Sequence, residues 1–232
     1  KRHGAVSVMQ YRENGILPEA LLNYLVRLGW SHGDEEIFSV DRMIELFDIE
    51  DVNKSASAFD TSKLEWLNQH YIKHDEPARI AHLLSPLMGK LDIDPTEGPA
   101  LVDVVKAQQE RATTLVEMAE TSAFFYKDFD NYDEKSAKKN LKAAAREPLL
   151  KLRERFTAMA DWQAEALHQV VQDVSAELEL NMGKVAMPVR VAVVGRAASP
   201  GIDITLQLVG KEATLRRIDK ALAYIDARVA AE

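Results

Sequence analysis

Apolar residues recur at helical spacing along almost the whole chain, and this pattern constrains the fold more than any other feature. In LPEALLNYLVRLGWS, Leu17 to Ser31, leucine and valine recur at intervals of three and four residues, which places them on one face of a helix. Pro18 suits the first turn of that helix, and Gly29 suits its end. Because strand-like alternation is rare elsewhere, the sequence predicts a mainly α-helical protein with little or no β structure.

Capping residues predict where the next helices begin. Ser39 can cap a short helix, and in DTSKLEWLNQHYI either Asp60 or Ser62 can cap the following one, Ser62 as a capping box with Glu65. The densest group of prolines and glycines in the chain lies between Leu84 and Ala100. Such residues interrupt helices, so we expect linkers near this stretch.

The second half of the chain shows the same helical spacing, interrupted by a second group of breakers. A long helical pattern runs from Pro99 to Tyr126, and the loop-like sequence DFDNYDEK follows it. Further helices are predicted over 138–160, 162–180 and 211–229. The segment MPVRVAVVG, Met187 to Gly195, differs because it is rich in valine, and its local propensity favours a buried strand.

Charge and composition exclude several classes of protein. Cysteine is absent, so the chain can have no disulfide and no thiolate zinc site, and no apolar run approaches the length of a membrane span. The formal net charge of −8 argues against non-specific nucleic-acid binding. Residues 1–137 hold 14 Lys and Arg against 25 Asp and Glu, whereas residues 138–232 hold 15 against 12. A polyanionic partner is therefore expected to prefer the C-terminal part.

Two groups of polar residues have spacings that suggest a metal site, but neither spacing is complete. His70 and His74 lie four residues apart, yet no third ligand is dictated by the sequence, which favours exposed histidines. DFDNYDE offers carboxylates, but Tyr132 and Asp133 occupy the positions at which a calcium loop needs an oxygen ligand and a glycine. We therefore predict no metal site, and a helix-capping loop at DFDNYDE.

The most informative polar stretch is GRAASPGID, together with Arg190 before it. Ser199 can cap a helix and Pro200 suits its first turn, which would point free backbone N–H groups at an anion or a base edge. Arg190 and Arg196 can stack on an unpaired base and hydrogen-bond its edge. The residues alone leave two interpretations open, a reader of single-stranded RNA and an ordinary turn.

Several blocks of the sequence resemble bacterial-type glutamyl-tRNA synthetases, class I enzymes that attach glutamate to its tRNA. The opening KRHGAVSV resembles the end of the family's KLSKR signature loop. The resemblance continues, in order, through three longer blocks: LPEALLNYLVRLGWSHGDEEIFS, VNKSASAFDTSKLEWLNQHYI and MPVRVAVVGRAASPGIDITLQLVGKEATLRRIDKAL.

The resemblance implies an incomplete enzyme. Lys1 and Arg2 would be the remnant of the loop that contacts ATP during glutamate activation, a task that suits the mobile charge of a lysine. The nucleotide-binding fold upstream would be missing, so this chain is expected to be inactive alone. The parent enzyme would use ATP and Mg²⁺, and neither is expected to be bound by this fragment.

The resemblance also implies a domain division and a binding site. Residues 1–77 would form the signature-loop end and a stem-contact domain, followed by helical anticodon-binding domains at 78–140 and 141–232. Because the family holds the anticodon in an all-helical cage, MPVRVAVVG is expected to be helical despite its valines. The residues that match the family's anticodon contacts are Arg190, Ser199, Pro200 and Ile202.

The implied partner is the tRNA for glutamate, with the tRNA for glutamine as a further possibility. Arg111 and Arg146 are two candidates for the arginine that reads the third anticodon base. We expect a cytoplasmic monomer that does not bind membranes. The alternative hypothesis is a helical scaffold of the same fold that binds RNA or protein without reading an anticodon.

Overall fold

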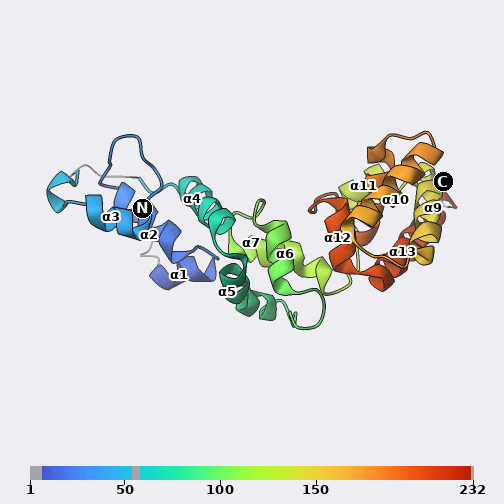
Figure 1. Ribbon diagram of the computed structural model, residues 1–232, viewed down its shortest axis with the longest axis horizontal. Helices are drawn as coiled ribbons and strands as arrows, with labels where there is room; N and C mark the ends of the chain where they lie inside the picture. Colours follow the sequence, from blue (N-terminus) through green and yellow to red (C-terminus); the bar gives the residue numbers. More distant parts are fainter. Residues whose placement is uncertain (1–6, 54–57, 231–232) are drawn as a thin grey trace. The chain divides into compact units, whose positions relative to one another are not determined.

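The structure is a computed structural model that describes residues 7–53 and 58–230, and Figure 1 shows helices joined by loops throughout these ranges. The only β pairing among the described residues is an isolated bridge between His32 and Glu35. The prediction of a mainly α-helical fold is therefore confirmed. The chain divides into two compact units, unit 1 within 1–92 and 108–120, and unit 2 within 93–107 and 121–232.

Unit 1 consists of short helices whose starts are set by capping side chains at α1, α3, η1 and α4 and by a first-turn proline at α2 and α5. Its elements are α1 (Val8–Glu13), α2 (Pro18–Arg27), α3 (Val40–Leu46), η1 (Ile49–Asp51), α4 (Thr61–His74), α5 (Pro77–Gly89) and the first turns of α7 (Leu115–Ser122). The Ser39 hydroxyl accepts a hydrogen bond from the Arg42 N–H at 3.1 Å, as predicted. At α4 the cap is Asp60, which accepts from Ser62 and Lys63, so the alternative with Ser62 as the cap is wrong.

Two helix boundaries differ from those expected. α5 continues through Pro86 and ends three residues later at Gly89. A proline inside a helix removes one helical hydrogen bond and crowds the carbonyl four residues before it, and α5 continues for only three residues after Pro86. The pattern from Pro99 to Tyr126 is interrupted between α6 (Leu101–Gln108) and α7. Thr114 accepts from the Glu117 N–H at 3.1 Å, so a new capped helix begins where one continuous helix was expected.

The buried side chain of Asn68 joins three parts of unit 1. It accepts a hydrogen bond from the Leu17 N–H at 2.8 Å and donates to the carbonyl oxygens of Gly15 at 3.1 Å and Thr113 at 2.7 Å. Asn68 is fully buried, so these bonds replace the water that the amide would otherwise bind. A polar side chain thus fastens the segment around residue 113 to the N-terminal helices.

Gly15 brings the same two segments together by their main chains. Its carbonyl accepts from the Leu115 N–H at 3.0 Å, and its φ of +79° lies in the region that favours glycine. A Cβ atom at this position would lie 2.5 Å from the nitrogen of Val116. Only glycine allows this approach of the two backbones.

Unit 2 contains a helical bundle around a large apolar core, and Figure 1 shows α9 to α13 gathered together. A smaller cluster of Val104, Phe124, Phe125 and Val194 adjoins this bundle within the unit. The elements of unit 2 are most of α6, the end of α7, η2 (Ala123–Phe125), α8 (Glu134–Asn140), η3 (Ala143–Ala145), α9 (Arg146–Ala158), α10 (Ala164–Glu177), α11 (Met182–Val194), α12 (Ile202–Val209) and α13 (Lys211–Val229). The helix predicted over 138–160 is divided into α8, η3 and α9, and Pro148 lies in the first turn of α9.

The valine-rich segment is helical. It forms most of α11, which contains Pro188 and ends at Gly195 in the left-handed conformation, with a φ of +82°. Pro188, Val189 and Val191 to Val194 are buried and Arg190 is partly buried, so this part of the helix lies inside the bundle and has no exposed polar face. The strand favoured by local propensity is therefore wrong, and the helix expected from the family resemblance is confirmed.

The predicted division into domains at 1–77, 78–140 and 141–232 stays a prediction.

No helix among the described residues combines the length and apolar character needed to cross a membrane.

Candidate functional site

The loop between α11 and α12, residues 195–201, contains two of the residues predicted to bind the anticodon. Arg190, on the last turns of α11, turns its guanidinium toward this loop. Its Nη1 donates to the carbonyl oxygens of Ser199 at 3.1 Å and Pro200 at 2.5 Å, and it also contacts the Ser199 hydroxyl. The structure thus brings Arg190, Ser199 and Pro200 together, and the arginine fixes the shape of the loop.

The hydroxyl groups of Ser199 and Thr205, both buried, hold the loop to α12. The Ser199 hydroxyl lies 3.1 Å from the Thr205 hydroxyl and donates to the Pro200 carbonyl at 3.0 Å. Ser199 is not the helix cap that was predicted, because α12 begins after Gly201 and has no side-chain cap. Ile202, the first residue of α12, is buried beside the loop. Thr205 was not predicted as a site residue, because nothing in the apolar sequence around it indicates that its hydroxyl supports the loop.

Hydrogen bonds with Asp133, just before α8, and with Ser136, in its first turn, hold the start of the loop. The Asp133 N–H donates to the Gly195 carbonyl at 2.8 Å, and the Ala197 N–H donates to the Ser136 hydroxyl at 3.1 Å. Asp133 also caps α8, since its carboxylate accepts from the Ser136 N–H at 2.8 Å, which confirms the helix-capping role predicted for DFDNYDE. The Ser136 hydroxyl also donates to this carboxylate, and this bond, followed by the one from the Ser136 N–H, holds the pKa of Asp133 below its ordinary value.

Arg217 of α13 is a supporting residue that the sequence did not reveal. It is only 4% exposed, and it donates to the Val193 carbonyl at 2.8 Å, the Lys127 carbonyl at 3.1 Å and the Asp128 carboxylate at 2.9 Å. Burial lowers the pKa of Arg217, while Asp128 opposes that shift. Burial raises the pKa of Asp128, but hydrogen bonds from Arg217 and Arg216 outweigh it and leave that pKa below 3.8.

The other predicted site residues are scattered. Lys1 and Arg2 lie outside the described residues, so the residues assigned to ATP have no described geometry. Arg111 is exposed on unit 1, whereas Arg146 on unit 2 pairs with Asp226 at 2.7 Å.

His70 and His74 are neighbours on α4, with ring centroids 4.2 Å apart. Among the described residues, no group of three or more possible metal ligands is found.

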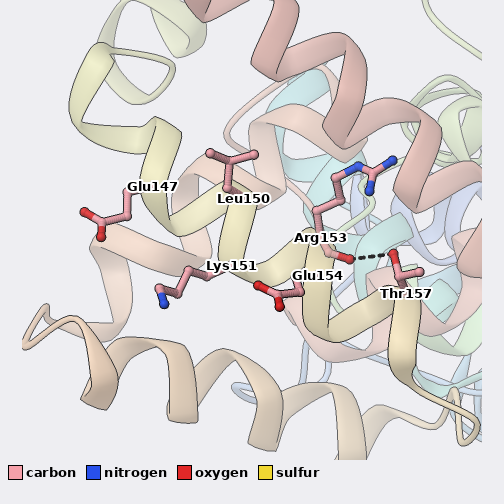
Figure 2. A pocket seen from close by; sticks show the side chains of 6 residues that line it. All are labelled: Glu147, Leu150, Lys151, Arg153, Glu154 and Thr157. Carbon is pink, nitrogen blue, oxygen red and sulfur yellow. Dashed lines mark hydrogen bonds between the residues drawn. The ribbon is translucent and has the colours of Figure 1, made fainter.

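A surface hollow of about 510 Å³ follows one side of α9, and Figure 2 shows the side chains that line it. The Thr157 hydroxyl donates to the Arg153 carbonyl at 2.7 Å within this hollow. The cations of the hollow are already paired, Lys151 with Glu177 at 2.5 Å and Arg153 with Asp219. The hollow therefore offers an anionic ligand little unpaired positive charge.

Comparison with known families identifies the part of the chain that contains this loop. A family model described as "Anticodon binding domain" matches residues 79–222, which is more than half of the chain. The chain belongs to the anticodon binding domain family. A second family model, described as the catalytic domain of class I tRNA synthetases (E and Q), matches residues 1–66.

Curated relatives extend the similarity of this anticodon binding domain protein over nearly all of its length. Glutamate–tRNA ligase 1 of Nitrosococcus oceani is 60% identical over 98% of the chain, and glutamate–tRNA ligase 1 of Alkalilimnicola ehrlichii is 57% identical over 99%. The chain spans about half the length of these curated relatives, 49% of each. The resemblance to glutamyl-tRNA synthetases predicted from the sequence is confirmed.

Solved structures agree with this family assignment. A glutamate tRNA ligase from Elizabethkingia meningosepticum, crystallised in complex with its amino acid, has a TM-score of 0.83 and 30% identity, and the match covers 93% of this chain and 43% of that one. A glutamate–tRNA synthetase from Elizabethkingia anophelis has a TM-score of 0.79 and 31% identity, over 92% of this chain and 42% of that one.

Proposed function

We propose that this chain is the tRNA-binding part of a class I glutamyl-tRNA synthetase, an ATP-dependent enzyme that ligates glutamate to its tRNA. The observation that carries this proposal is the site itself: Arg190 of α11 bonds Ser199 and Pro200 in the loop at 195–201, inside the segment that matches the anticodon binding domain. The parent enzyme would use Mg²⁺ with ATP, in the cytoplasm. The chain would act as a monomer, and the tRNA for glutamine is a second possible partner.

The loop has the features expected of a platform for unpaired bases. Recognition of single-stranded RNA depends on bases that are splayed out, stacked and hydrogen-bonded at their edges. Ser199, Pro200 and Ile202 are buried, and the Ser199 hydroxyl is held by Arg190 and Thr205, so these residues fix the shape that the loop presents to a base. A loop held in this way loses little conformational freedom when a base binds. Lys1 and Arg2 would contact ATP in the complete enzyme.

Exchange of the anticodon is expected to weaken binding of the glutamate tRNA to this chain. Base-edge contacts depend on base identity, and each good contact is worth about 1 to 3 kcal/mol of discrimination. Competition binding between the glutamate tRNA and the same transcript with another anticodon measures the difference. Equal competition by the two transcripts would contradict anticodon reading and would favour the scaffold alternative.

Arg190→Ala is expected to reduce anticodon-dependent affinity by about 1 to 3 kcal/mol, because it removes the donor that orders the Ser199 and Pro200 carbonyls. The matched control is Arg153→Ala, which removes an arginine of the same unit that pairs with Asp219 on the surface. Affinity for both transcripts, measured by fluorescence anisotropy, tests the effect. An unchanged affinity of Arg190→Ala would remove Arg190 from the site.

A further inference from the structure

One face of α8 carries three lysines next to the candidate anticodon site. Lys135, Lys138 and Lys139 are spaced at i, i+3 and i+4, and all three are exposed. We refer to them as the lysine face. Ser136, Ala137 and the following Leu141 are buried on the other side of the helix. The short helix is thus attached to the bundle by small and apolar residues and presents its charge outward.

The lysines of the lysine face form no ion pairs with the described residues of the chain. Within the described part of the chain, none of the three lysines lies within 4.0 Å of a carboxylate as an ion pair, whereas the cations of α9 are paired. Those pairs are Arg146–Asp226, Lys151–Glu177, Arg153–Asp219 and Arg155–Glu177. A phosphate that approached α9 would have to displace a carboxylate, but at the lysine face it would only displace water and mobile ions.

The lysine face is tied to the loop at 195–201 by hydrogen bonds. The Ser136 hydroxyl, between two of the lysines in sequence, accepts from the Ala197 N–H at 3.1 Å. Asp133, the cap of α8, donates its N–H to the Gly195 carbonyl at 2.8 Å. Lys138 and Lys139 lie less than one helical turn, about 5 Å, beyond Ser136 along the axis. Ser136 contacts the loop from the buried side of α8, whereas the lysines lie on its outward side, so a strand whose base is held at this loop reaches them by passing over the outward side of the helix.

We propose that the lysine face of α8 binds the phosphate backbone of the RNA strand whose bases the loop at 195–201 reads. The inference rests on the proposed function, and it assigns the backbone contacts to α8, separately from the base contacts of the loop. Lysine is suited to this role because a flexible point charge can neutralise a phosphate without reading a base. The attraction is local, in a chain whose formal net charge is −8.

The test compares the double variant Lys138→Gln/Lys139→Gln with Lys106→Gln/Lys151→Gln in the 232-residue chain. The control makes the same change in net charge, but its lysines are already paired with Asp103 and Glu177. The probes are the glutamate tRNA transcript and its anticodon-exchanged form, titrated over a range of salt concentrations. For the α8 variant we expect a loss of affinity of about tenfold for both transcripts, and a log–log salt slope reduced by about 1.4 to 1.8.

The salt slope and the loss of affinity for the two transcripts either support or contradict the proposal. A salt slope equal to that of the wild-type or of the control variant would overturn it, as would a loss confined to the transcript with the glutamate anticodon. Lys138→Arg/Lys139→Arg should keep the slope, because it keeps both charges, and thermal unfolding of each variant reports whether the bundle is intact. If the wild-type chain binds both transcripts equally, anticodon reading fails while the slope comparison still tests the lysine face.

Discussion

Asn68→Ala is expected to destabilise unit 1 by about 3 to 5 kcal/mol, one of the two largest effects in the molecule. The substitution leaves the buried Leu17 N–H and the Thr113 carbonyl without their partners and takes one of two hydrogen bonds from the Gly15 carbonyl. Buried polar groups without partners carry their full desolvation penalty. Urea unfolding, followed by far-UV circular dichroism, should show an earlier transition for unit 1.

Two further variants separate the causes of this effect. Asn68→Asp keeps an acceptor for the Leu17 N–H but cannot donate to the two carbonyl groups, so we expect it to be destabilising as well. Gln69→Ala changes a partly exposed neighbour on the same helix and should shift the free energy of unfolding by less than about 0.5 kcal/mol. An Asn68→Ala protein that unfolds at the same urea concentration as the wild-type would contradict the role assigned to this side chain.

Arg217→Met should destabilise unit 2 by about 2 to 4 kcal/mol. The methionine keeps the apolar stem but removes the donors that serve the carbonyl groups of Val193 and Lys127 and the carboxylate of Asp128. Arg217→Lys should recover only part of the loss, because an ammonium group cannot reproduce the planar fork. The melting temperature of unit 2, measured by thermal unfolding of the wild-type, Arg217→Met and Arg217→Lys proteins, tests this prediction. A melting temperature of Arg217→Met within one degree or so of the wild-type would contradict this prediction.

The pairing of Asp128 with Arg217 also predicts a dependence on pH. The pKa of Asp128 in the folded chain lies below its ordinary value of 3.8, so the pair contributes full stability above that value. The contribution is lost as the pH falls through the lower, folded pKa. Asp128→Asn removes the titrating group, so its stability should fall less steeply with acid than that of the wild-type. Parallel curves for the two proteins would contradict this link.

The features that could be predicted from the sequence are those set by local interactions. Apolar spacing gave the helical fold class, and the caps at Ser39 and Asp60 gave helix starts, because a cap and its helix are adjacent in the chain. The valine-rich part of α11 was predicted locally as a strand because its residues are almost all apolar. Without alternating polar positions, the 3.6-residue period of a helix cannot be recognised in the sequence.

The features that were missed depend on contacts between distant residues. Asn68 reaches partners 45 and 53 residues away, and nothing in the sequence around it marks them. Arg217 gave a weak signal that could have been used, since it lies on the buried face of α13 with Ile218, Ala221 and Ile225. A charge on an apolar face indicates a buried, bonded cation. At the candidate site, the sequence indicated the loop but not the direction of the Arg190 side chain.

The approach of Gly15 to Leu115 also bears on the order in which the protein can fold as it is synthesised. Unit 1 is assembled from two stretches of chain, and residues 93–107, which belong to unit 2, are made between them. The Gly15 carbonyl can therefore bond the Leu115 N–H, and the Asn68 amide the Thr113 carbonyl, only after the ribosome has added those residues. Domains generally fold as units when their residues have emerged. The N-terminal unit of this protein cannot be completed first, and a chain that ends before residue 113 would lack the carbonyl that the buried Asn68 amide bonds at Thr113.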